Sequence, residues 1–120
     1  MPLPTDPANL QRGREAEAQA DAYLCAQGLT PLAQNYRTRT GEIDLIMKER
    51  EVLVFVEVRF RARADFGGAA ETVNIAKQRR VRTAAEGFLQ AHPAYARCAC
   101  RFDVVAFDRG RIEWLRDAFQ

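Results

Sequence analysis

Two carboxylates on adjacent β-strand patterns are the residues best placed to do chemistry. Residues 42–47 alternate in the manner of a strand, with Glu42, Asp44 and Ile46 on one side and Ile43, Leu45 and Met47 on the other. Residues 52–60 form a β-branched and aromatic run that contains Glu57 and is apolar on both faces in its first half. The polar tetrapeptide between the two runs predicts a turn. Asp44 and Glu57 are therefore expected on neighbouring antiparallel strands, with the second strand central in a sheet.

The length of this turn decides whether the charged side chains meet. An even number of turn residues makes the paired positions sum to an odd number, and four charged residues then share one face: Glu42, Asp44, Glu57 and Arg59. An odd number scatters them. Hairpin loops of two and four residues are both common, so the shared face is favoured.

A close pair of carboxylates predicts a bound cation. Two such groups near a core repel each other and are costly to desolvate unless positive charge lies between them. Hard oxygen ligands without His or Cys indicate Mg²⁺ or Mn²⁺, and Mg²⁺ is commonly held by one or two carboxylates together with water and substrate phosphate. The alternative is a structural network of salt bridges in which Arg59 and Arg61 neutralise the acids.

Two further charged residues are predicted to point toward the same place. Lys77 extends the apolar stripe of Val81 backward by four residues, so it lies on the helix face that packs against the sheet. Glu17 precedes Leu24 by seven residues, which places it at the border of a buried helical stripe. The alternatives are a lysine that extends to solvent and an ordinary surface glutamate.

The elements that must position these residues follow from periodicity and turn signals. The chain is predicted to form one α/β domain over residues 1–120, in the order α-β-β-β-α-β-β, with a mixed β-sheet flanked by helices. Helices are expected at 9–26 and 74–91, and strands at 32–36, 42–47, 52–60, 101–107 and 111–115. Gly28 and Pro93 end the helices, and Asn74 caps the second one. Residues 1–8 are expected to be disordered and residues 61–71 to form a mobile loop.

Composition narrows the functional class. The chain is 48% hydrophobic and 28% charged, as in ordinary soluble globular proteins. The longest apolar run, residues 52–56, is far short of the ~18 residues of a membrane span, and the start has no signal-peptide pattern. We therefore expect a cytoplasmic protein. Three cysteines give no disulfide framework, and Cys98, Cys100 and His92 fit no common zinc spacing.

The charges are unevenly distributed along the chain. Residues 57–82 carry seven basic side chains and three acidic ones, whereas residues 1–56 carry six basic and eight acidic ones. A locally basic segment in a nearly neutral chain favours a face that binds a polyanion such as nucleic acid. A merely solvated charged surface is the alternative.

Six short motifs occur in order and carry a family resemblance. They are Gly13-Arg14-Glu15-Ala16-Glu17, Asn35-Tyr36-Arg37, Gly41-Glu42-Ile43-Asp44-Leu45-Ile46, Val54-Phe55-Val56-Glu57-Val58-Arg59, Lys77-Gln78 and Arg101-Phe102-Asp103-Val104-Val105. The set resembles the YraN-like family of small bacterial proteins of unassigned function and covers nearly the whole chain. That family in turn resembles the PD-(D/E)XK nuclease superfamily, which includes archaeal Holliday-junction resolvases and type II restriction enzymes. The resemblance implies a restriction-endonuclease-like core with the same order of elements.

The resemblance also implies roles for individual residues. Asp44 and Glu57 would be the metal-binding carboxylates, with Glu42 as a further acid of the metal site. Glu17 would match a helical glutamate of the resolvase-like members. Arg59 stands where most of these nucleases carry lysine, and Lys77 could supply the missing amine. Arginine remains protonated and does not readily deprotonate water, although its planar fork can grip a phosphate.

The function implied in this way is Mg²⁺- or Mn²⁺-dependent hydrolysis of DNA phosphodiesters, including those of branched or structured DNA. Five arginines would contact flanking phosphates without reading the base sequence: Arg61, Arg63, Arg79, Arg80 and Arg82. Arg59 favours an alternative, a DNA-binding accessory protein on the same scaffold with weak or absent catalysis. The chain is small enough that a homodimer is compatible with either function.

Overall fold

The computed structural model describes residues 7–60 and 73–120, with side chains from residue 13 onward. The elements are α1 (Pro7–Ala26), β1 (Thr30–Arg37), β2 (Glu42–Glu49), β3 (Val52–Phe60), α2 (Ile75–Ala91), the short 3-10 helix η2 (Pro93–Tyr95), β4 (Ala99–Asp108) and β5 (Arg111–Phe119). The predicted α/β class and the order α-β-β-β-α-β-β are confirmed.

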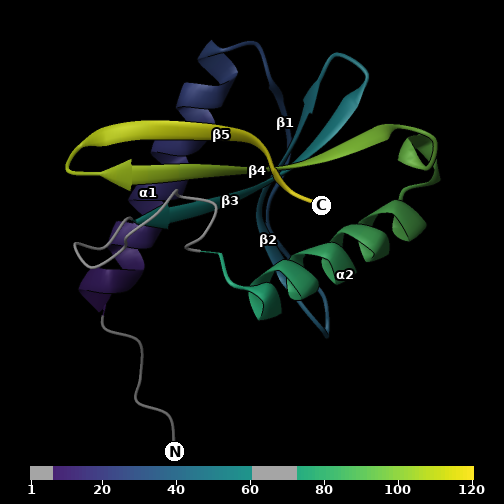
Figure 1. The fold of residues 1–120 in the computed structure, drawn as a ribbon, viewed down its shortest axis with the longest axis horizontal. Helices are drawn as coiled ribbons and strands as arrows, with labels where there is room; N and C mark the ends of the chain where they lie inside the picture. The colour runs from purple at the N-terminus through teal and green to yellow at the C-terminus, as the bar shows by residue number, and fades with distance from the viewer. Residues whose placement is uncertain (1–6, 61–72) are drawn as a thin grey trace, which may run out of the picture.

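All five strands form one mixed sheet in the order β1-β2-β3-β4-β5. Neighbouring strands are antiparallel except β3 and β4, which are parallel and are connected through α2. The two helices lie on opposite faces of the sheet (Figure 1), and each covers its own apolar cluster. Neither helix of the described chain is long and apolar enough to cross a membrane.

Local sequence explains both helices. Ala16, Ala20 and Leu24 recur every four residues on α1 and are buried against the sheet. The helix ends before Gly28, whose φ of 102° is a conformation that glycine adopts at little cost. α2 starts after Asn74, whose side-chain oxygen accepts a hydrogen bond from the Lys77 backbone N–H at 2.8 Å. The predicted cap is therefore confirmed.

The observed boundaries correct several expected ones. α1 begins at Pro7, so residues 7 and 8 are helical rather than disordered, because proline is tolerated in the first turn of a helix. Most strands extend beyond their expected ends, since backbone pairing continues through polar positions. β2 includes Lys48 and Glu49, so the turn to β3 has two residues instead of four. Residues 1–6 and the expected mobile loop at 61–71 lie outside the described residues.

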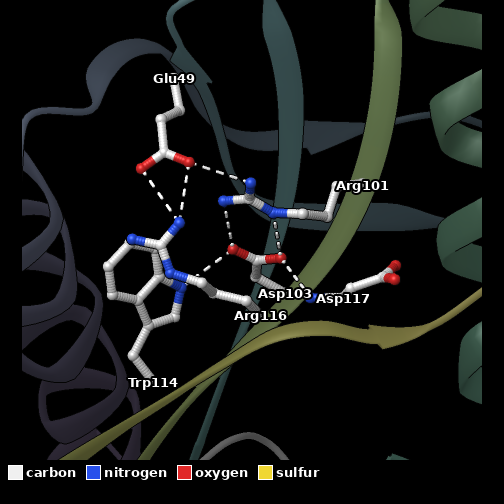
Figure 2. A network of polar contacts seen from close by, with 6 residues as sticks. All are labelled: Glu49, Arg101, Asp103, Trp114, Arg116 and Asp117. Atoms are coloured by element: carbon white, nitrogen blue, oxygen red, sulfur yellow. Dashed lines mark hydrogen bonds and ion pairs between the residues drawn. The ribbon is translucent and has the colours of Figure 1, made fainter.

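A buried carboxylate fixes the carboxy-terminal hairpin (Figure 2). Asp103 on β4 is fully buried and accepts two hydrogen bonds from the Arg101 guanidinium, at 2.9 and 3.0 Å. It also accepts from Trp114 Nε1 and from the Asp117 backbone N–H, each at 2.9 Å. The β4–β5 register shifts at this point, and Asp117 has a φ of 52°. The Asp103 carboxylate thus replaces the backbone acceptor that the irregular ladder lacks.

Glu49, at the end of β2, joins this network to the rest of the sheet. Its carboxylate lies 2.9 Å from the guanidinium groups of both Arg101 and Arg116. Arg116 in turn stacks over the Trp114 ring, with 3.9 Å from its guanidinium carbon to the ring centroid. The network therefore connects β2, β4 and β5 through charged side chains.

We expect Asp103→Asn to lower the free energy of unfolding by about 3 kcal/mol or more, because it removes the buried one of the two carboxylates that neutralise Arg101 and turns an amide N–H toward other donors. Urea denaturation measures the change. Glu86→Gln on the exposed side of α2 is the matched control, which also replaces a carboxylate by an amide, and should stay within about 0.5 kcal/mol of the wild type. Equal stability of the two variants would contradict the assigned role of Asp103.

Candidate functional site

The site is built where the β2–β3 ladder stops. Backbone pairs run from Glu49 and Val52 at the turn to Leu45 and Val56, and the turn has the even length that favours a shared face. Beyond Leu45 and Val56 the next two residues are Asp44 and Glu57. No backbone pair joins them in the described strands, and their side chains take over the hydrogen bonding.

The two carboxylates are held by reciprocal hydrogen bonds to the opposite strand. The Asp44 backbone N–H donates to Glu57 Oε2 at 3.1 Å, and the Val58 backbone N–H donates to Asp44 Oδ2 at 2.8 Å. Each carboxylate thereby satisfies an N–H group that the end of the ladder leaves without a carbonyl partner. Both side chains are consequently fixed in position and lie next to each other.

The same break overturns part of the predicted alternation along β2. Ile43 was expected on the same side as Leu45 and Met47, which pack in the α1 cluster. Instead it packs with Ile46 in the α2 cluster. Regular alternation requires a continuous pleat, and the pairing of β2 with β3 ends between these residues. Asp44 therefore stands at the point where the strand changes the face that it presents.

The negative charge of Glu57 is poorly compensated by its neighbours, although the side chain is fully buried from solvent. Its Oε1 lies 3.2 Å from Lys77 Nζ, and no donor in the described chain has the geometry of a hydrogen bond to it. Burial and the neighbouring Asp44 charge raise the pKa of Glu57 to about 7, although Lys77 acts in the opposite direction. The Glu57 carboxyl group is therefore protonated in about half of the molecules near pH 7.

Asp44 is subject to the same forces. Burial raises its pKa above the ordinary value, and the charge of Glu42 acts in the same sense. The hydrogen bond from Val58 and the positive charges of Lys77 and Arg59 oppose this rise. Arg59 therefore belongs to the electrostatic environment of the pair, as the sequence predicted.

Two more acids lie beside the pair. Burial and the Asp44 charge raise the pKa of Glu17 on α1, while a hydrogen bond with the Asn35 side chain lowers it. Glu42 Oε2 lies 3.3 Å from Arg37 Nε, and both of these side chains are exposed. Within the described residues no group of three metal-ligating side chains is found. The structure thus pairs Glu42 with Arg37 and does not draw it into the Asp44–Glu57 pair.

The predicted basic residues fall in different places. Lys77 points inward to Glu57, as its position on the helical stripe predicts. Arg82 donates to the Gln120 backbone carbonyl at 2.6 Å, and Arg79 is exposed on α2. Arg80 lines a cleft that also includes Arg37 and Arg39. Arg61 and Arg63 lie outside the described residues.

Three residues near the site were not predicted to act there: Asn35, Arg37 and Arg39. Asn35 and Arg37 belong to a motif that the sequence displayed, but nothing in the periodicity of β1 indicated their partners. The φ of Asn35 is 51°, a left-handed conformation in which asparagine is enriched. That conformation accompanies its contact with Glu17 across to α1.

The donor set suits a small divalent cation. Two carboxylates from adjacent strands supply hard oxygen ligands, and Glu57 Oε1 lies near the Lys77 ammonium group without a hydrogen bond from any described residue. A cation that displaced Lys77 would meet an oxygen that already lacks a hydrogen bond. Asp44 and Glu57 therefore fit Mg²⁺ or Mn²⁺ better than a soft metal, which prefers thiolate or imidazole ligands.

The fold and the site together define a small α/β protein with a carboxylate pair at the open end of a central hairpin. Residues 16–107 match the family described as "Uncharacterised protein family UPF0102". A UPF0102 protein of Saccharophagus degradans is 52% identical over 109 residues, which cover 91% of this chain and 92% of the relative. A UPF0102 protein of Ralstonia nicotianae is 53% identical over 123 residues, covering 99% and 94%. The chain belongs to the UPF0102 family, which confirms the YraN-like resemblance.

The raised pKa of Glu57 can be measured directly. We expect the Glu57 carboxyl carbon, followed by NMR, to titrate with a midpoint near the raised pKa of about 7. Asp44→Asn should lower this pKa because it removes a neighbouring negative charge, and Lys77→Met should raise it because it removes the positive one. Midpoints that do not move, or that move in the opposite directions, would contradict the described electrostatics.

Proposed function

We propose that this protein is a cytoplasmic, metal-dependent phosphodiester hydrolase that acts on DNA, including branched or structured DNA. The observation that carries the proposal is the Asp44–Glu57 pair: two adjacent buried carboxylates, one of them with an oxygen that lies 3.2 Å from Lys77 Nζ and accepts no hydrogen bond within the described chain. Such a pair is costly to keep charged. A role in binding a cation gives a physical reason to maintain it.

Asp44 and Glu57 would hold the cation, Mg²⁺ or Mn²⁺. When bound, the metal supplies a Lewis acid for the phosphate and a more acidic water. The hydrogen bonds from the backbone N–H groups of Asp44 and Val58 keep both carboxylates in one orientation, so little rearrangement is needed on binding. The strand ends thus act as a preformed frame for the site.

Lys77 and Arg59 would stabilise charge on the reacting phosphate. The Lys77 ammonium is mostly buried and already close to the pair, so it can turn from Glu57 to a phosphate oxygen when a cation neutralises the carboxylates. Arg59 has the planar fork that grips phosphate. Glu17, near Asp44 on the α1 side, is positioned to accept a hydrogen bond from a ligand at the edge of the site.

A second candidate function is DNA binding with little or no catalysis. Arg59 favours it, because arginine is a poor base, and the nearest lysine is engaged in an ion pair with Glu57. In that case the same residues would hold a phosphate without cleaving its ester bond. The two functions differ in whether product appears, which makes them separable by one assay.

Purified protein with Mg²⁺ or Mn²⁺ should cleave at least one of linear, flapped and four-way DNA. We expect Asp44→Asn and Glu57→Gln each to reduce the rate by about 10²-fold or more, because each removes charge from the metal site. Glu51→Gln, in the turn at the opposite end of the hairpin, is the matched control and should cleave at the wild-type rate.

The outcomes of this assay are distinct. Cleavage that persists in both site variants would assign the activity to a contaminant and overturn the proposed hydrolysis. DNA binding by the wild type without any product, weakening steeply as salt rises, would establish the accessory function instead.

Metal binding should depend on pH in a defined direction. Because the pKa of Glu57 is about 7, the group carries a proton at pH 5.5 that it must release when a cation binds. Calorimetry with Mn²⁺ is therefore expected to show affinity that falls by up to about tenfold per pH unit below pH 7 and levels off above it. Asp44→Asn should abolish the binding. Equal affinity at pH 5.5 and pH 8 would exclude Glu57 as a ligand.

A further inference from the structure

A second feature lies beside the carboxylate pair: a cleft between the β1–β2 turn and the first turns of α2. Its volume is about 350 Å³, and it is lined by Arg37, Thr38, Arg39, Thr40, Gly41, Glu42, Lys77 and Arg80. We call it the arginine cleft. Four of these side chains are cationic and one is anionic, so the lining has a net charge of +3. Lys77 and Glu42 connect it to the site already described.

Two of the four positive charges of the arginine cleft are available to a ligand. Lys77 neutralises Glu57, and Arg37 neutralises Glu42. Arg39 and Arg80 are exposed, and among the residues that the structure describes no carboxylate forms an ion pair with either of them. Two guanidinium groups that have no ion-pair partner among the described residues thus line one cavity, which is an arrangement suited to an external anion.

The walls of the cleft are held at a fixed separation. Thr38 Oγ1 accepts a hydrogen bond from the Gly41 N–H at 3.1 Å, and the Thr38 N–H donates to the Gly41 carbonyl at 2.7 Å. Gly41 packs directly against the Arg80 backbone, so closely that a Cβ atom there would overlap the Arg80 carbonyl oxygen. This contact joins the turn to α2, so that Arg39 on the turn and Arg80 on α2 line the same cavity.

The residues that line the arginine cleft indicate which part of a nucleic acid it would bind. Among the described lining residues none is aromatic, so the arginine cleft offers no platform on which a base could stack. Guanidinium groups and threonine hydroxyls are instead typical contacts of phosphate oxygens. The volume is at the small end of the range for ligand pockets, sufficient for a phosphate with part of its sugar.

We propose that the arginine cleft binds a phosphate group of a nucleic-acid strand, next to the phosphate that occupies the Asp44–Glu57 site. The inference rests on the proposed function and extends it: the strand would run from the carboxylate pair past Lys77 to Arg39 and Arg80. Contacts of this kind set the position of the strand and carry no sequence preference.

The test measures binding without metal, so that hydrolysis plays no part. A 12-nucleotide oligothymidine with a 3′ fluorophore, with and without a 5′ phosphate, is titrated in EDTA and followed by anisotropy. We expect the double variant Arg39→Gln/Arg80→Gln to bind about tenfold more weakly, with a salt slope shallower by about 0.7, the value for one phosphate contact on a single strand. The matched control is Arg50→Gln/Arg97→Gln, which removes the same charge at the opposite end of the sheet and should change binding less than twofold.

A second variant keeps the test decisive if the first one folds poorly. Thr40→Glu adds a negative charge to the cleft wall without removing an arginine, and it should weaken binding as well. Thermal unfolding checks that each variant is folded. Equal weakening by the cleft and control variants, or wild-type binding by both cleft variants, would overturn the proposal.

The two oligonucleotides identify the source of the phosphate. Equal losses for both would assign the arginine cleft to an internal phosphodiester, and a loss confined to the 5′-phosphorylated strand would assign it to a terminal phosphate; either result supports the site. Failure of the hydrolysis assay leaves this measurement intact, because no metal is present. Conversely, a protein that cleaves DNA but binds it equally well in the cleft variants would retain the proposed function and lose this inference.

Discussion

The separation of β2 from β3 after Leu45 and Val56 is the constraint on which the site depends. At that point two backbone N–H groups, those of Asp44 and Val58, lose the carbonyl partners that a regular ladder would supply. A carboxylate from each strand crosses the gap and accepts the bond. The hydrogen bonds that end the hairpin are thus the same ones that bring two like charges together. Asp44 and Glu57 therefore stabilise the end of the hairpin and are also the residues proposed to bind the cation.

The topology explains why charges from both helices reach this point. α2 connects the parallel strands β3 and β4, so its first turn lies near the end of β3, where Glu57 and Arg59 stand. Lys77 then meets Glu57 from one face of the sheet. Glu17 on α1 approaches from the other face, close enough to sense the charge of Asp44. The open end of the hairpin is consequently reached from both sides of the sheet.

A comparison of two buried acids shows what distinguishes the site from a structural ion pair. Asp103 and Glu57 are both fully buried, and each has a cationic neighbour. Asp103 accepts from Arg101, Trp114 and a backbone N–H, so its oxygens are well supplied with donors. Glu57 instead shares its surroundings with a second carboxylate, and one of its oxygens has no aligned donor in the described chain. Incomplete satisfaction of a buried charge is what makes Glu57 a candidate for binding a ligand.

Sequence patterns alone determined the order of the elements, the cap at Asn74 and the end of α1 at Gly28. They favoured the placement of Asp44 next to Glu57, which the even length of the turn then decided. These features depend on residues close together in the chain, whose periodicity and turn chemistry act locally. The inward orientation of Lys77 was also predicted, because Lys77 lies on the same helical stripe as buried residues of α2. The family membership follows from the same motifs.

Only the tertiary structure decided the remaining features. The Glu49–Arg101–Asp103 network and the arginine cleft join elements that are distant in sequence. The face of Ile43 and the pairing of Glu42 with Arg37 are local in sequence, but they depend on how the strands pair. Their geometry depends on strand register, on where the β2–β3 ladder ends and on how closely Gly41 approaches α2. Periodicity assigns a side chain to a face of its own element, but it contains no information on the separation between two elements. That separation is set by the packing of the whole core, and it determines which charges become partners and which stay available to a ligand.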